Sequence, residues 1–122
     1  MLRALIVLLA TIALPAQNAA GRWTGASANG DFNIALEPSA GDWKCEVTFT
    51  FGGTEVKTKV TNVKVSGAKV EAQYEFDLGG NILQSTIQGE LAGGRLKGTY
   101  STVAVQNRQP VDQGDFEASK VK

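Results

Sequence analysis

The sequence contains no histidine and a single cysteine in 122 residues. Without histidine, the chain has no Ser/His or Cys/His nucleophile pair, no imidazole general base and no zinc or iron site that uses imidazole. One cysteine forms no intramolecular disulfide and no thiolate cluster. Paired inward carboxylates, a nucleophile elbow and a phosphate loop are also missing from the pattern, so we expect neither catalysis nor a cofactor.

Neither sign of charge is in excess, since 12 Lys and Arg balance 12 Asp and Glu. With the two signs interleaved, the chain has no field that would steer it toward nucleic acid or an anionic membrane, so nucleic acid is not an expected partner. Asp112, Asp115 and Glu117 lack the Asp-x-Asp-x-Asp-Gly spacing of a calcium loop, and no metal is expected there.

The N-terminus has the pattern of a secretory signal peptide over residues 1–20. A short basic start with Arg3 precedes an apolar run over residues 4–14, and a small-residue exit follows it. The run is too short to span a bilayer, and we expect cleavage after Ala19 or Ala20. The mature chain, residues 21–122, is then a single exported domain, periplasmic or extracellular, and the absence of Asn-x-Ser/Thr sites is consistent with a bacterial source.

From Gly21 onward apolar and polar residues alternate, and turn dipeptides recur at short intervals, as in all-β sandwiches and barrels. We predict an eight-stranded antiparallel up-and-down (meander) barrel whose last strand pairs with its first. The expected strands are residues 22–28, 31–37, 43–51, 54–65, 69–78, 81–91, 95–103 and 114–121.

Folding each hairpin about its turn predicts the register, because a slip of one residue would expose the apolar face. The turns are expected at Asn29-Gly30, Gly52-Gly53, Gly67-Ala68, Gly79-Gly80 and Gly93-Gly94. A change from even to odd inward positions predicts a β-bulge near Thr61-Asn62. The expected inward pairs include Trp23–Leu36, Leu36–Trp43, Val47–Thr58, Cys45–Val60, Val65–Val70, Phe76–Leu83, Tyr74–Ser85 and Ile87–Tyr100; the expected outward pairs include Glu46–Lys59, Lys64–Glu71 and Glu90–Lys97.

The outward positions are mainly Lys, Glu, Gln and Thr, whereas a membrane barrel needs an apolar outer band. We therefore expect no membrane insertion of the mature chain.

Short motifs along the chain resemble those of calycin-type barrels. Gly21-Arg22-Trp23 is similar to the Gly-x-Trp that opens lipocalins and their relatives, and with Thr24 it also resembles the first strand of avidin-type barrels. The segments at residues 89–91, 94–100 and 114–118 look like those of small secreted bacterial barrels of uncharacterised function. The resemblance implies a calycin-like fold with a small-molecule pocket in the barrel mouth. The lipocalin C-terminal helix and disulfide are lacking, and the later tryptophans of biotin sites find no match, so biotin binding is not implied.

All nine aromatic side chains point inward in this register, which leaves open whether the barrel is filled. A dry cavity of about 300 Å³ would cost roughly 7 kcal/mol at about 24 cal/mol per Å³, against a typical domain stability of about 5–15 kcal/mol. This comparison favours a filled or nearly filled interior, with a pocket as the alternative.

Polar groups inside the barrel mark the place where a pocket would lie. Tyr74, Ser85 and Thr102 form a row across three strands, and either they contact a ligand or they bond one another or water. The row lies one layer below the end with the Gly52-Gly53 and Gly79-Gly80 turns and a long loop at Ala104–Gln113. The candidate ligand-binding residues are Phe49, Phe51, Tyr74, Phe76, Leu83, Ser85 and Thr102.

The sequence therefore predicts an exported, non-catalytic barrel that binds a small hydrophobic ligand in its mouth. The alternative is a solid-core protein-interaction or protease-inhibitor-like module that acts on a protein partner through its loops and N-terminus. A cavity behind Phe49 and Phe76 would favour the first function, and its absence the second.

Overall fold

The computed structural model describes residues 19–27 and 30–121, which form an antiparallel meander of nine strands. Most of the predicted signal peptide lies outside these residues. The strands are β1 (Gly21–Ser27), β2 (Gly30–Ser39), β3 (Asp42–Phe51), β4 (Thr54–Lys57), β5 (Lys59–Ser66), β6 (Lys69–Leu78), β7 (Asn81–Ala92), β8 (Arg95–Ala104) and β9 (Pro110–Lys120).

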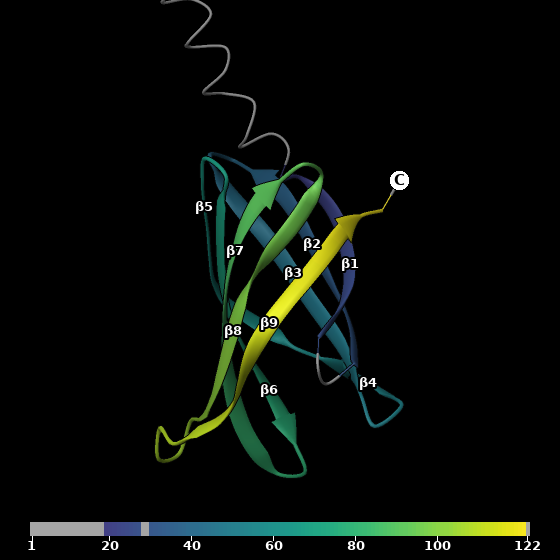
Figure 1. The fold of residues 1–122 in the computed structure, drawn as a ribbon. Helices are drawn as coiled ribbons and strands as arrows, with labels where there is room; N and C mark the ends of the chain where they lie inside the picture. Colours follow the sequence, from purple (N-terminus) through teal and green to yellow (C-terminus); the bar gives the residue numbers. More distant parts are fainter. Residues whose placement is uncertain (1–18, 28–29, 122) are drawn as a thin grey trace, which may run out of the picture.

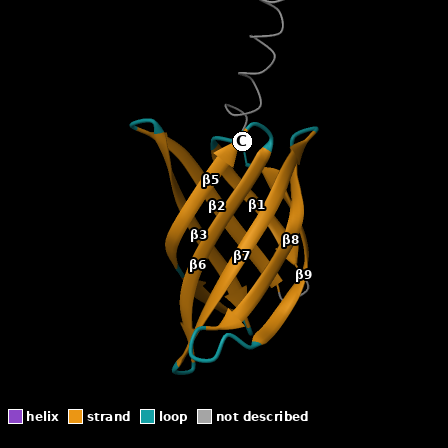
Figure 2. Cartoon of the chain, turned by 90° about the vertical axis from the view of Figure 1, so that its left-hand side faces the viewer, coloured by secondary structure: helices purple, strands orange, loops and turns teal. Residues whose placement is uncertain are grey.

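The sheet curls into a nearly closed barrel, as predicted (Figure 1; Figure 2). Its order is β4-β3-β2-β1-β9-β8-β7-β6-β5, so the last strand pairs with the first, with Ser27 opposite Phe116. The strands are tilted relative to the barrel axis, as closure of a sheet into a barrel requires (Figure 2). Within the described residues no helix is long and apolar enough to cross a membrane.

The strand predicted over residues 54–65 is two strands, which changes the count from eight to nine. β4 pairs with β3 up to Thr48↔Lys57, whereas β5 pairs with β6. Between them, the Thr58 hydroxyl donates a hydrogen bond to the Val47 carbonyl at 2.7 Å. A side chain thus replaces the next rung of the ladder, and the predicted ladder pairs Val47–Thr58, Cys45–Val60 and Glu46–Lys59 are wrong.

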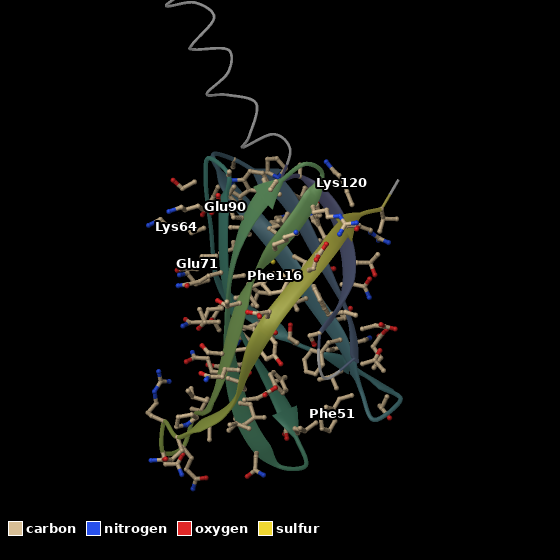
Figure 3. The ribbon with its side chains drawn as sticks, in the orientation of Figure 1. Phe51, Lys64, Glu71, Glu90, Phe116 and Lys120 are labelled. Carbon is tan, nitrogen blue, oxygen red and sulfur yellow. The ribbon has the colours of Figure 1, made fainter. Side chains whose placement is uncertain are left out.

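Four hairpins have the predicted register beside their turns, with Phe49 opposite Val56, Val65 opposite Val70, Phe76 opposite Leu83 and Leu91 opposite Leu96. The predicted bulge is also present, as a register shift between Val60 and Asn62. On the outer face, Lys64 and Glu71 are opposite each other and Glu90 projects beside them (Figure 3).

Two registers differ from the prediction by two residues, which keeps every side chain on its expected face. Trp23 is opposite Ile34 rather than Leu36, because Ser27 pairs with Gly30. Leu36 is opposite Cys45 rather than Trp43, because β2 and β3 extend to the Ala40-Gly41 turn. Both turn residues have positive φ (49° and 82°), as two-residue hairpin turns often require.

β9 begins at Pro110, so the expected long loop at Ala104–Gln113 is only residues 105–109. The pairing of β8 with β9 shifts between Thr102 and Val103, a bulge that the sequence analysis did not predict. This early start of β9 decides which residues face the barrel interior near the loop.

The core is packed at the end of the barrel where the described chain begins and ends, called the termini end below. Trp23, Ile34 and Leu96 are almost completely buried there. The Trp23 indole N–H donates a hydrogen bond to the Ala19 carbonyl at 3.0 Å, and Ala19 is itself buried. This end is therefore filled and covered.

Candidate functional site

A cavity of about 380 Å³ occupies the opposite end of the barrel. The strand ends of this part of the barrel lie at the bottom of Figure 1. The prediction of a filled interior is therefore wrong for this half of the molecule. The cavity lies among the strand ends that carry the β1–β2, β3–β4, β6–β7 and β8–β9 connections. All seven candidate residues line it: Phe49, Phe51, Tyr74, Phe76, Leu83, Ser85 and Thr102.

Aromatic rings form much of the cavity wall. Phe49 and Phe76 meet edge to face with ring centroids 4.9 Å apart, and Tyr74 lies beside Phe76 at 6.1 Å. On the other side, Phe32 and Phe116 make a second edge-to-face pair at 5.4 Å. These arrangements are the favoured ones for aromatic pairs, so the wall is held by its own packing.

Phe51 lies at the rim, where 45% of its surface is exposed (Figure 3). Val111, 54% exposed, also lines the cavity. Since exposed and buried residues line the same space, the cavity reaches the surface at this end of the barrel.

The hydroxyl row predicted inside the barrel is present and buried. Ser85 Oγ and Thr102 Oγ1 are 2.6 Å apart, and Ser85 also bonds the Tyr74 hydroxyl. Burial raises the pKa of Tyr74, and the Ser85 hydrogen bond partly offsets the rise. The hydroxyls therefore satisfy one another, and no ligand is needed to complete their hydrogen bonds.

Asp112 is a charged cavity residue that the sequence pattern did not single out for binding. The Tyr100 hydroxyl donates a hydrogen bond to Asp112 Oδ2 at 3.1 Å, and both residues line the cavity. Partial burial raises the pKa of Tyr100, and the hydrogen bond and negative charge of Asp112 raise it further. Inward residues alternate along β9, so Phe116, Gly114 and Asp112 share one face. This signal was not used because residues 104–113 were predicted to be a loop.

Neither tryptophan lines the cavity. Trp23 on β1 and Trp43 on β3 lie near the start of their strands, at the other end of the barrel. Cys45 is half-buried, and burial with the nearby charge of Glu46 raises its pKa to about 12. A thiol with this pKa stays protonated at neutral pH and is a poor nucleophile.

In the described part of the chain, no three His, Cys, Asp or Glu side chains are grouped so as to hold a metal ion. The fold and site define a small, nearly closed antiparallel barrel with an apolar cavity at one end. No family model, curated protein or solved structure matches the chain, so its function is argued from this geometry.

Proposed function

We propose that the protein is an exported, non-catalytic, calycin-like binding protein that holds a small hydrophobic ligand in the mouth of its barrel. The observation that carries the proposal is the 380 Å³ cavity walled by Phe32, Phe49, Phe76 and Phe116. Apolar concave sites with a few polar groups are the usual form of small-molecule sites.

The energetic cost of the cavity supports a binding role. A space of this volume leaves the apolar side chains of its wall without packing partners on one side, so they lose dispersion contacts that an apolar occupant would restore. With one cysteine, the chain has no intramolecular disulfide to offset this loss. Larger side chains at these positions would fill the space, so its presence favours an occupant.

Two sequence features support the rest of the proposal. The apolar leader over residues 1–20 favours export, and the Gly21-Arg22-Trp23 opening favours a calycin relative. The cavity counts against the alternative of a solid-core interaction or inhibitor module, whose interior would be filled.

Titration with N-phenyl-1-naphthylamine, a neutral probe that fluoresces in apolar surroundings, tests the proposal. We expect saturable enhancement with one probe per chain. The probe itself must report binding, because neither tryptophan lines the cavity. The absence of saturable binding by this probe and by a panel of isoprenoids and aromatic metabolites would contradict the proposal.

A matched pair of variants locates the bound probe. Leu83→Trp places a large ring inside the cavity, and we expect it to abolish binding at a stability cost of about 1–3 kcal/mol. Ile82→Trp adds the same ring at the neighbouring position, which is 44% exposed and faces outward, and should leave binding unchanged. Circular dichroism verifies that both variants are folded.

A further inference from the structure

We infer that the cavity selects ligands with a cationic, hydrogen-bond-donating head, such as a primary amine on an apolar body, and disfavours carboxylates. The inference rests on the proposed function and deepens it by assigning the head group. The observation behind it is the position of Asp112 inside a cavity whose described lining residues include no lysine or arginine.

The charged residues around the cavity are acidic. Asp112 is half-buried and follows the inward alternation of Phe116 and Gly114, opposite the buried Thr102. Asp31 also lines the cavity but is exposed at the rim, next to the inward Phe32. Of these two carboxylates, Asp112 is the one placed to face a ligand.

The basic residue in the loops at this end of the barrel does not point into the cavity. Four connections lie at this end of the barrel: residues 28–29, 52–53, 79–80 and 105–109. In their sequences, Arg108 is the one lysine or arginine. Its guanidinium donates a hydrogen bond to Gln84 Oε1 at 2.9 Å. Gln84 lies on the outer face because its neighbour Ser85 faces inward. Arg108 is therefore held on the outside of the barrel.

The surroundings of Asp112 suit an ammonium group. Its carboxylate lies in the cavity wall and accepts a hydrogen bond from the Tyr100 hydroxyl, and a carboxylate accepts hydrogen bonds at about four lone-pair sites. A cation beside Asp112 would also face the aromatic walls, and rings attract cations through their negative faces. An apolar tail would occupy the space between Phe49, Phe76 and Phe116.

A carboxylate head group would bind less favourably than an ammonium group in this cavity. It would approach Asp112 in partly apolar surroundings, where like charges repel more strongly than in water. The described lining offers it no cationic partner. A neutral alcohol head would fall between the two, since it can donate one hydrogen bond to Asp112 without charge.

Competition among three ten-carbon compounds tests the inference, because they differ only in the head group. The volume of about 380 Å³ corresponds to roughly a dozen water-sized groups, which fits this chain length. Decylamine, decanol and decanoate each displace bound N-phenyl-1-naphthylamine at pH 7. We expect decylammonium to compete best and decanoate to need a concentration at least about tenfold higher.

Asp112→Asn tests the residue itself, because it keeps the size and the acceptor for Tyr100 but removes the charge. We expect the affinity for decylammonium to fall about tenfold, while that for decanol changes by less than about twofold. Asp115→Asn makes the same charge change at an exposed position of β9, opposite Thr99. It should leave the order of the three affinities unchanged.

The outcomes separate this inference from the proposed function. Equal or tighter binding of decanoate, or an unchanged amine preference in Asp112→Asn, would overturn the head-group assignment while saturable probe binding still supported a ligand site. If the probe and all three compounds failed to bind, both proposals would fall. Decylammonium competing best, with the preference lost only in Asp112→Asn, supports both.

Discussion

In this barrel, the partners of a single side chain depend on the strands that the fold places beside it. Ser85 and Thr102 look like potential ligand contacts in the sequence, yet their hydroxyls bond each other at 2.6 Å. Asp112 looks like a loop residue, yet it lies in the cavity wall. For Ser85 and Thr102 the pattern predicted the inward face and the neighbouring strand decided the partner, whereas for Asp112 the pairing of β9 with β8 decided the face as well.

Cys45 gives a pH prediction at this scale. Burial raises its pKa from 9.0 to about 12, so the unfolded chain ionises first as the pH rises. The protonated thiol therefore contributes stability below pH 9, and this contribution is lost progressively between pH 9 and 12. Urea unfolding measured across this range should show a smaller alkaline loss for Cys45→Ala than for the parent chain.

Thiol chemistry provides the control for this prediction. At pH 8 the folded chain should react with iodoacetamide much more slowly than the urea-unfolded chain, because the thiolate is the reactive form. Equal rates would show that the folded Cys45 thiol is not held protonated.

At the scale of strands, close approach of the backbone shapes the barrel as much as apolar alternation does. Gly98 on β8 is opposite Gly89 on β7 and Phe116 on β9. A Cβ at residue 98 would overlap the Gln88 carbonyl oxygen. The missing side chain thus lets the two strands approach, and the Phe116 ring fits over the neighbouring Gly89.

We expect Gly98→Ala to lower the free energy of unfolding by about 1–3 kcal/mol or more, since a strand must shift to admit the methyl group. Equilibrium urea unfolding measures the change. Ser101→Ala, at an exposed position of the same strand, should change stability by less than about 0.5 kcal/mol. A neutral Gly98→Ala would mean that the strands have room to separate.

Across the whole molecule, the two ends of the barrel differ in packing. The termini end is filled by Trp23 and covered by Ala19, whereas the other end contains the cavity. Lys120 also lies over the Trp23 ring, with its ammonium 5.7 Å from the ring centroid. Residues near both termini therefore help to close one end.

This closure predicts that Ala19 belongs to the folded domain. A chain that begins at Gly21 lacks the carbonyl that accepts the Trp23 indole hydrogen bond, so it should be less stable than one that begins at Ala19. We expect a difference of about 1–3 kcal/mol in urea unfolding, the cost of an unsatisfied buried donor. Cleavage after Ala19 or Ala20 would remove this acceptor; equal stabilities would show that it is dispensable.

The sequence by itself determined the barrel class, the inward face of each strand and four hairpin registers beside their turns. These follow from local rules, because side chains alternate along a strand and a glycine turn fixes which residues pair. It could not separate registers that differ by two residues, as at Trp23 and Leu36, because both keep the same faces inward.

Only the tertiary structure decided the break at Thr58, the inward position of Asp112 and the cavity. The break depends on a hydrogen bond to Val47 on another strand, and the position of Asp112 depends on where β9 begins to pair with β8. The cavity depends on how closely rings from facing walls approach, as in the Phe49–Phe76 and Phe32–Phe116 pairs. Alternation shows which side chains enter the interior, but whether they fill it is a property of barrel diameter and strand tilt.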